Sequence, residues 1–248
     1  MSGSVRIAMW SGPRNISTAM MRAFENRADC AVIDEPFYAH YLKQTQSDHP
    51  AREAVIAAGE TDWRRVVAAL TGPVPDGRRV FYQKHMTHHM LRHIGHDWFG
   101  QLSHAFLIRD PRAVLLSYIK SRPDAEVTAD DIGVPQQAAL YDEIAARAAT
   151  PPPVIDSDGF LKAPEAHLRS LCERLGIPFT DRMLHWPAGP RASDGIWAPH
   201  WYAAVLKSTG FEPWCERDLR VPERYRKVID ACMVDYERLH RHRIVVTR

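Results

Sequence analysis

The sequence has few cysteines and no long hydrophobic run. Its four cysteines, Cys30, Cys172, Cys215 and Cys232, form no Cys-x-x-Cys pair. The N-terminus lacks the apolar stretch of a secretory signal peptide, and no segment approaches the length of a membrane span. These absences favour a reducing, cytoplasmic setting and no membrane partner.

An excess of one charge is also missing. The chain has 32 Lys and Arg against 30 Asp and Glu, a formal net charge of +2. This balance is too even for a protein that binds nucleic acid by general electrostatic attraction, so we expect no nucleic-acid partner and only local anion binding. There is no internal repeat, and 248 residues of which 45% are hydrophobic can bury one substantial core. We therefore predict a single domain over residues 1–248.

The Gly-x4-Gly-Lys-Ser/Thr loop of nucleoside triphosphatases is absent as well. The lysine that reaches the outer phosphates and the hydroxyl that holds magnesium are thus not in their usual places, which disfavours a kinase that uses ATP and magnesium. What the chain does have is an apolar run at residues 6–10, a tight turn, and a helix-compatible segment from Thr18. The turn consists of Gly12, Pro13, Arg14, Asn15, Ile16, Ser17 and Thr18.

This turn has the features of an anion site. The first N–H groups of a helix have no partner inside it, and the helix dipole adds partial positive charge there. Arg14 adds a planar, permanently charged group that suits phosphate or sulfate oxygens. Ser17 and Thr18 could cap the helix or donate hydrogen bonds to the same anion. The alternative is an ordinary turn between a strand and a helix, with a serine as the cap.

A second charged group follows the apolar run at residues 105–108. Arg109 comes directly after this run, Pro111 suits the first position of a helix, and Ser117 falls on that helix. The turn at residues 12–18 and the segment from Arg109 to Ser117, called the two anion grips below, suit a ligand with two separated anionic groups. One charge-assisted hydrogen bond contributes about 1.5–3 kcal/mol, whereas micromolar affinity needs about 8 kcal/mol, so one such site would not be enough. The alternative is a surface ion pair between Arg109 and Asp110.

Short apolar runs alternate with helical patterns along the chain, which predicts an α/β fold: a parallel sheet flanked by helices on both faces. The expected strands are 6–10, 30–33, 79–82, 105–108 and 154–155. The expected helices are 18–27, 51–58, 62–70, 112–121, 136–149, 164–175 and 222–239. Ligands of such sheets bind beyond the carboxyl ends of the strands. No secondary structure is predicted for residues 180–222, which show no clear periodicity.

The two anion grips together resemble the nucleotide-binding signatures of the sulfotransferases that use 3′-phosphoadenosine-5′-phosphosulfate (PAPS). The resemblance covers residues 5–121 and implies a P-loop-type fold. It implies that the first loop cradles the 5′-phosphosulfate, with Arg14 in place of the family's lysine, and that Arg109 and Ser117 hold the 3′-phosphate. The segment from Lys207 to Phe211 loosely resembles the late basic loop that closes over the 3′-phosphate, although its glycine also fits a helix C-cap.

The resemblance also implies a catalytic role for Lys84. In many members a Lys-x-His follows the third strand, with the lysine on the sulfuryl group and the histidine as general base. Relative to the histidine position of this pattern, His85 comes one residue too early and His88 two residues too late, so the sequence does not decide which of them is the base. Glu35 is a third candidate because it directly follows the second strand, next to the loop that would hold the sulfate. Its alternative role is an ion pair that positions Arg14 or Lys84.

We therefore expect sulfuryl transfer from PAPS to a hydroxyl or amine of a small-molecule acceptor, without a metal ion. The alternatives are a P-loop kinase and a nucleotide-binding regulator that has lost turnover. A metal site at His85, His89, His93 and His96 is a weaker possibility, since neither a cysteine nor an ordered set of carboxylates accompanies them. The sequence identifies neither the acceptor nor the oligomeric state. An acceptor pocket lined by Trp186, Trp197, Trp201, Tyr202 and Trp214 is the less favoured interpretation, because aromatic side chains are more often part of a core.

Overall fold

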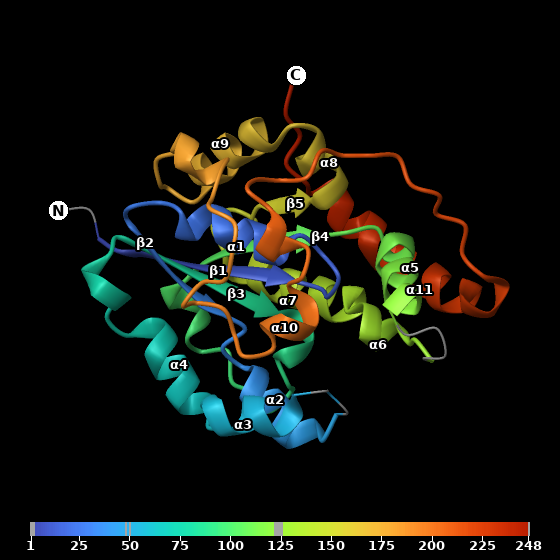
Figure 1. Cartoon of the computed structure of the whole chain (residues 1–248), viewed down its shortest axis with the longest axis horizontal. Helices are drawn as coiled ribbons and strands as arrows, with labels where there is room; N and C mark the ends of the chain where they lie inside the picture. Colours follow the sequence, from blue (N-terminus) through green and yellow to red (C-terminus); the bar gives the residue numbers. More distant parts are fainter. Residues whose placement is uncertain (1–2, 48, 50, 122–125, 248) are drawn as a thin grey trace.

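Five parallel strands form the centre of the computed structural model, which describes residues 3–47, 49, 51–121 and 126–247. The strands are β1 (Val5–Ser11), β2 (Cys30–Asp34), β3 (Val80–Met86), β4 (Ser103–Ile108) and β5 (Val154–Asp156). They lie in the order β2-β3-β1-β4-β5 (Figure 1). All five predicted strands are confirmed, and because every pair is parallel, their carboxyl ends meet at one edge of the sheet.

Helices cover the sheet and extend beyond it. They are α1 (Ser17–Glu25), α2 (Tyr38–Thr45), α3 (Arg52–Ala58), α4 (Trp63–Thr71), α5 (Pro111–Ser121), α6 (Ala129–Ile132), α7 (Val134–Arg147), α8 (Ser157–Lys162), α9 (Pro164–Arg174), α10 (Ala198–Trp201) and α11 (Arg226–Arg241). The predicted helices are all present, with ends shifted by a few residues. Sequence patterns missed α2, α6, α8 and α10, which have eight residues or fewer.

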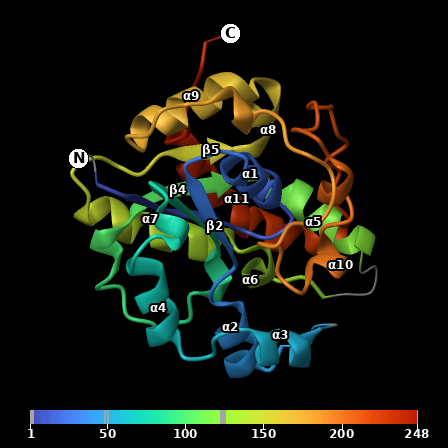
Figure 2. The same ribbon diagram turned by 60° about the vertical axis from the view of Figure 1, so that its left-hand side comes forward.

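The alternation of side chains along β1 explains why helices cover both faces. Ile7 and Met9 point to one face and pack with α1 and α9, whereas Ala8 and Trp10 point to the other and pack with α4, α7 and α11. All four side chains are fully buried. Figure 2 shows α8 and α9 on one side of the strands and α4 and α7 on the other. The predicted α/β fold with two covered faces is confirmed.

Strand β3 continues to Met86, four residues beyond its predicted end at Tyr82. Gln83, Lys84 and His85 are therefore inside the strand, and Lys84 and His85 point to opposite faces. The strand extends this far because it is paired on both sides, with β1 through Met86 and with β2 through Lys84. A polar sequence does not end a strand whose backbone groups are bonded on both sides.

The segment between α9 and α11 has little regular structure. It contains α10 and the single 3-10 turns Asp181–Met183, Val205–Lys207 and Glu223–Tyr225. Residues 186–208 form a loop whose ends are joined, because the Trp186 indole donates to the Ser208 hydroxyl (3.1 Å) and the Gly189 N–H donates to the Leu206 carbonyl (2.8 Å). This late loop packs α10 on α2 and α3 at the carboxyl edge of the sheet. None of the helices in the described ranges is both long and apolar enough to cross a membrane.

Candidate functional site

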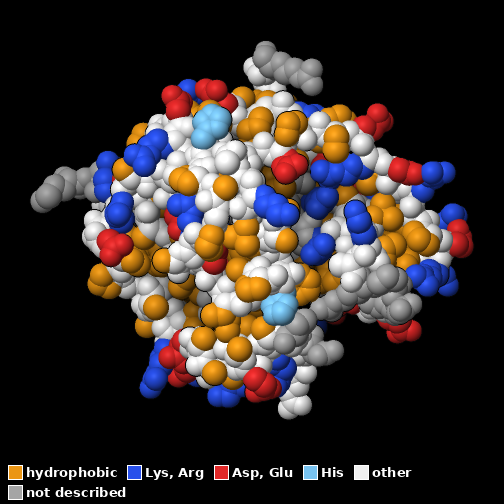
Figure 3. All heavy atoms as spheres, in the orientation of Figure 1, with side chains coloured by type: hydrophobic (Ala, Val, Ile, Leu, Met, Phe, Trp, Pro, Cys, Tyr) orange, Lys and Arg blue, Asp and Glu red, His pale blue; other side chains and the backbone are white. Residues whose placement is uncertain are grey.

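A cavity of about 640 Å³ lies at the carboxyl edge of the sheet. Its lining includes residues 13–19 of the first loop, then Glu35, Lys84 and Arg109 near strand ends, and residues of α2, α5 and the chain between Trp201 and Arg217. Lys and Arg side chains gather to the right of centre in Figure 3, on the side toward which β1 and β3 point in Figure 1. The two predicted anion grips therefore lie in one cavity.

The first loop opens the N-terminus of α1 to this cavity. The N-cap residue is Ile16, and no side chain caps the helix. The first-turn N–H groups thus stay available to a ligand, as do the hydroxyl-bearing residues Ser17 and Thr18, which line the cavity. Asn15 holds the loop, since its side chain donates to the Leu107 carbonyl (3.1 Å) and accepts from the Ile16 N–H (2.8 Å).

Gly12 does not line the cavity but lets the loop pass close to its neighbours. A Cβ at this position would lie 3.1 Å from the carbonyl oxygen of Ile132. Two residues on, Arg14 takes a φ of 55°, a left-handed conformation that costs energy in a residue with a side chain. This strained residue lies in the turn that leads from β1 into α1.

The Arg14 side chain points toward the second anion grip. Its Nε donates to the Ser117 hydroxyl (3.0 Å), and Arg109 donates to the Arg14 carbonyl oxygen. Arg217 lines the same part of the cavity and pairs loosely with Asp158 at 3.8 Å. Burial lowers the pKa of Arg109, and the nearby charges of Arg217 and Arg14 lower it further. A concentration of positive charge that depresses a guanidinium pKa is a place where an anion is stabilised.

Lys84 lies at the other side of the cavity and contacts three oxygen atoms. Its Nζ donates to Asp34 Oδ1 (2.8 Å), Glu35 Oε1 (2.6 Å) and the Tyr202 hydroxyl (2.8 Å). Burial opposes the charge of Lys84, but Asp34 and Glu35 outweigh it and hold its pKa well above the usual value. Lys84 is therefore a buried lysine at the cavity wall that is protonated near pH 7.

Glu35 has a left-handed backbone conformation and a carboxyl group with a raised pKa. Its φ is 43°, in the left-handed region, and its N–H donates to the Lys84 carbonyl (2.9 Å). Burial raises the pKa of its carboxyl group more than the charge of Lys84 lowers it, and Asp34 adds to the increase. Strain and a raised pKa at a cavity wall are common features of catalytic acids and bases.

Aromatic rings and uncharged histidines line the rest of the cavity. Tyr38 stacks on His89 with ring centroids 4.6 Å apart, and Tyr41 contacts both His88 (5.3 Å) and His89 (4.7 Å). Burial lowers the pKa of His88 to about 4 and lowers that of His89 well below its usual value. Both histidines are neutral near pH 7. The cavity wall next to Lys84 and Glu35 therefore consists of aromatic rings and uncharged imidazoles.

Besides Gly12, two further predicted site residues do not line the cavity. His85 is on the opposite face of the sheet from Lys84, stacked on Trp10 at 4.4 Å, and its pKa is lowered to about 3 by burial. It is a core residue because β3 continues through it. Lys207 is exposed and does not line the cavity, whereas Ser208, Gly210 and Arg217 do. The chain after α10 therefore brings Arg217 to the cavity instead of the predicted Lys207.

Sequence patterns also missed residues that belong to the site. Asp34 and Tyr202 were not predicted as partners of Lys84, and no motif pointed to Arg217. Of the predicted aromatic residues, Trp201 and Tyr202 line the cavity, whereas Trp186, Trp197 and Trp214 do not. His85, His89, His93 and His96 do not share a helix, and the described residues contain no group of three or more metal-ligating side chains placed to hold an ion.

A family model for a sulfotransferase domain matches residues 5–240. The chain belongs to the sulfotransferase family. Two proteins of Arabidopsis thaliana, named branched-chain-amino-acid aminotransferase-like proteins 2 and 1, are each 35% identical to it over 95% of its length. The chain spans only 41% and 42% of their lengths. Their similarity to this chain thus concerns less than half of each protein.

Solved sulfotransferase structures share the fold. The sulfotransferase domain from the curacin biosynthetic pathway is 16% identical, with a TM-score of 0.61 over 95% of this chain and 99% of that one. Mouse sulfotransferase SULT7A1, solved in complex with PAP, is 12% identical, with a TM-score of 0.59 over 94% of this chain and 85% of that one. The resemblance inferred from residues 5–121 thus extends over nearly the whole chain.

Proposed function

We propose that this sulfotransferase-family protein transfers a sulfuryl group from PAPS to a hydroxyl or amine of a small molecule. The observation that carries the proposal is the cavity itself. A helix N-terminus, a cluster of guanidinium groups and a buried lysine face one space of about 640 Å³. The PAP bound in the mouse SULT7A1 structure is the product that PAPS would leave.

The donor is oriented by its two anionic ends. We assign the 3′-phosphate to Arg109 and Ser117, with Arg14 and Arg217 beside them, because these four residues line one part of the cavity. We assign the 5′-phosphosulfate to the N-terminus of α1, with Ser17 and Thr18, and to Lys84. Pro13, Asn15 and Ile16, which also line the cavity, belong to the loop between β1 and α1. The assignment of Arg14 differs from the sequence-based interpretation, which gave Arg14 to the phosphosulfate.

The transfer step needs a positive charge and a base. The bond between sulfur and the bridging oxygen of the 5′-phosphate breaks, and a bond from sulfur to the acceptor oxygen or nitrogen forms. Adenosine 3′,5′-bisphosphate leaves with the bridging electron pair, and Lys84 stabilises the negative charge that develops there. The acceptor proton goes to the base.

Glu35 is our first choice for this base. It lines the cavity next to Lys84, and its raised pKa brings it closer to the operating pH, where a general base works best. His88 also lines the cavity, and its Nδ1 has no hydrogen-bond partner among the described residues. We keep His88 as the second choice because its pKa of about 4 makes it a weak base.

The proposal is tested by ligand binding and by turnover. Thermal unfolding is measured with adenosine 3′,5′-bisphosphate, with 5′-AMP, with ATP and magnesium, and with sulfate. A ligand at 100 times its Kd stabilises by about 2.7 kcal/mol, which raises the Tm of a chain of this size by several degrees. We expect this shift for the bisphosphate and a much smaller one for 5′-AMP.

The turnover measurement separates the remaining alternatives. PAPS is incubated with a panel of phenols, alcohols and amines, and the bisphosphate and sulfated product are quantified with and without EDTA. Product formation in EDTA supports the proposal. Stabilisation by ATP and magnesium alone would instead favour a kinase, and bisphosphate binding without turnover on any acceptor would favour a regulator.

A further inference from the structure

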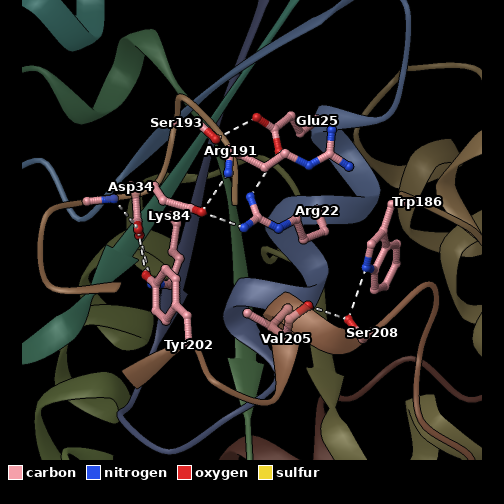
Figure 4. A network of polar contacts seen from close by, with 12 residues as sticks. Arg22, Glu25, Asp34, Lys84, Trp186, Arg191, Ser193, Tyr202, Val205 and Ser208 are labelled. Atoms are coloured by element: carbon pink, nitrogen blue, oxygen red, sulfur yellow. Dashed lines mark hydrogen bonds and ion pairs between the residues drawn. The ribbon is translucent and has the colours of Figure 1, made fainter. Parts of the chain in front are cut away.

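The hydrogen bonds of Lys84 leave it no free N–H group. A lysine ammonium has three donors, and here they go to Asp34, Glu35 and Tyr202 at 2.6–2.8 Å. Figure 4 shows Asp34 and Tyr202 meeting beside Lys84. A sulfuryl oxygen can accept a hydrogen bond from Lys84 only if one of these three partners gives way.

Asp34 and Tyr202 are held firmly. Asp34 Oδ2 accepts from the Tyr202 hydroxyl (2.5 Å) and lies 3.4 Å from the Gly195 N–H, and the Asp34 side chain is only 1% exposed. The Tyr202 hydroxyl also accepts from the Trp197 indole (3.2 Å). Each of these two partners of Lys84 is thus fixed by contacts with other residues.

The late loop that carries Tyr202 is itself anchored. The buried Arg22 of α1 donates to Asp194 Oδ2 (2.8 Å). Ser193 donates to Glu25 Oε1 (2.5 Å), and Figure 4 shows this bond as a dashed line. Because Arg22 is only 1% exposed, this anchor is shielded from water. The loop therefore holds Tyr202 on Lys84 independently of any ligand.

Glu35 is held less firmly than the other two partners. Its side chain is 12% exposed, and it lines the cavity, as Asp34 does not. Its Oε2 lies 4.0 Å from His89 Nδ1, an atom with no hydrogen-bond partner among the described residues. Glu35 is thus the partner of Lys84 that a ligand in the cavity can reach, and an unused polar atom lies next to it.

We propose that Asp34 and Tyr202 are positioning residues that keep Lys84 in place, and that the sulfuryl group of the donor replaces Glu35 as its third partner. This inference rests on the proposed function. One exchange then does two things: it gives an N–H of Lys84 to the sulfuryl group, and it frees the Glu35 carboxylate for the acceptor proton. Bisphosphate alone, which lacks the sulfuryl group, leaves the pair between Lys84 and Glu35 intact.

The exchange is tested by comparing two ligands on one variant. In Glu35→Gln the competing carboxylate is gone, so PAPS should gain affinity relative to the bisphosphate by at least about threefold, because a neutral amide binds an ammonium group more weakly than a carboxylate does. Calorimetry without an acceptor measures both ligands. Glu60→Gln, which removes a carboxylate that does not line the cavity, is the matched control and should leave the ratio unchanged. An unchanged or lower ratio in Glu35→Gln would overturn the exchange.

The positioning role is tested by the pH dependence of PAPS cleavage. The titratable groups that face Lys84 are Asp34, Glu35, Tyr82, His89 and Tyr202. In Asp34→Asn one of the two carboxylates that raise the pKa of Lys84 is lost while burial remains, so the alkaline limit of activity should move down by about one pH unit or more. Tyr202→Phe should lower kcat about tenfold at unchanged bisphosphate affinity, because one hydrogen bond to a charged group is lost.

Two control variants separate positioning from stability. Asp156→Asn alters a buried aspartate that accepts from a tyrosine but has no lysine, so it should lose stability without moving the alkaline limit. Tyr82→Phe removes a buried hydroxyl on the same strand that has no hydrogen-bond partner among the described residues, and should leave kcat unchanged. Equal pH profiles for Asp34→Asn and the unmodified protein, with an unchanged kcat in Tyr202→Phe, would overturn the positioning role. If the unmodified protein neither binds the bisphosphate nor cleaves PAPS, the proposed function fails instead.

Discussion

The two edge strands of the sheet end in the same way but do different things. Asp34 ends β2 and Asp156 ends β5, and each accepts a hydrogen bond from a tyrosine far along the chain, Tyr202 at 2.5 Å and Tyr236 at 2.9 Å. The next residues, Glu35 and Ser157, both line the cavity. The difference lies in the neighbouring strand.

Strand register decides which of these ends acquires a charged partner. Asp34 lies beside Lys84 of β3, whereas Asp156 lies beside Ile108 of β4. Without a cation, Asp156 accepts from the Gly159 N–H (2.8 Å) and caps α8. At the end of β5, the pair of Asp156 and Tyr236 thus has only a structural role. At the end of β2, the pair of Asp34 and Tyr202 belongs to the candidate site because Lys84 lies beside Asp34 in the neighbouring strand.

The largest expected effect comes from making the β2 end resemble the β5 end. Lys84→Met should lower turnover about a thousandfold, since it removes the charge that stabilises the leaving group. It should also destabilise the fold by about 3–5 kcal/mol, because Asp34 and Glu35 stay buried without a cation. Denaturant unfolding and PAPS cleavage measure the two losses.

A second substitution separates these losses. The double variant Lys84→Met with Asp34→Asn should regain much of the stability, because it buries fewer unpaired charges, but none of the turnover. If Lys84→Met alone kept near-normal turnover, β2 would be as purely structural as β5, and the proposed site would be wrong.

The next effect concerns Glu35, the residue that follows Asp34. Glu35→Gln should reduce turnover about a hundredfold and abolish the acid limb of the pH profile. A base works when it is deprotonated, so activity should rise with pH through the pKa of Glu35, which burial raises above the usual value. The pH profile of kcat/KM measures this. An acid limb that survives in Glu35→Gln and disappears in His88→Ala would make His88 the base.

The sequence predicted the sheet and its polar edge because these depend on local patterns. Apolar runs followed by Gly12, Glu35 and Arg109 mark strand ends, and the strand ends of a parallel sheet share one edge. The resemblance to the family pointed to Lys84, which does line the cavity, although it lies inside β3 and not after it. It left the choice between His85 and His88 open, because that choice depends on whether β3 continues, and β3 continues through its pairing with β1 and β2.

The contacts that complete the site are the part that sequence patterns could not supply. Tyr202 is 118 residues from Lys84 along the chain, and its loop is held by contacts with residues that are far away in the sequence. Arg217 lies in a segment without regular structure. Such residues leave no periodic signal in the sequence. The loose resemblance of the segment from Lys207 to Phe211 to the family's late basic loop therefore pointed to Lys207 and not to Arg217.

A smaller effect is expected on the donor side. Arg109→Ala should weaken adenosine 3′,5′-bisphosphate binding about ten- to a hundredfold, which corresponds to about 1.5–3 kcal/mol. It should change 5′-AMP binding much less, because 5′-AMP lacks the 3′-phosphate. Calorimetry with both nucleotides gives the comparison, and Arg65→Ala, outside this cavity, is the control. Equal affinity of the unmodified protein for the two nucleotides would contradict the assignment.

The smallest effect concerns Ser157, the counterpart of Glu35 at the β5 end. Its side-chain hydroxyl is buried, has no hydrogen-bond partner among the described residues, and belongs to a residue that lines the cavity. A hydroxyl left without a partner beside a cluster of arginines is available to a nucleotide, so Ser157→Ala should weaken bisphosphate binding by about two- to tenfold, the usual contribution of one neutral hydrogen bond. Turnover at saturating PAPS should change little, because Ser157 follows the strand end that has no lysine. Ser170→Ala on α9, away from the cavity, is the matched control. Unchanged bisphosphate affinity in Ser157→Ala would show that both residues at the β5 end, and not Asp156 alone, serve only the fold.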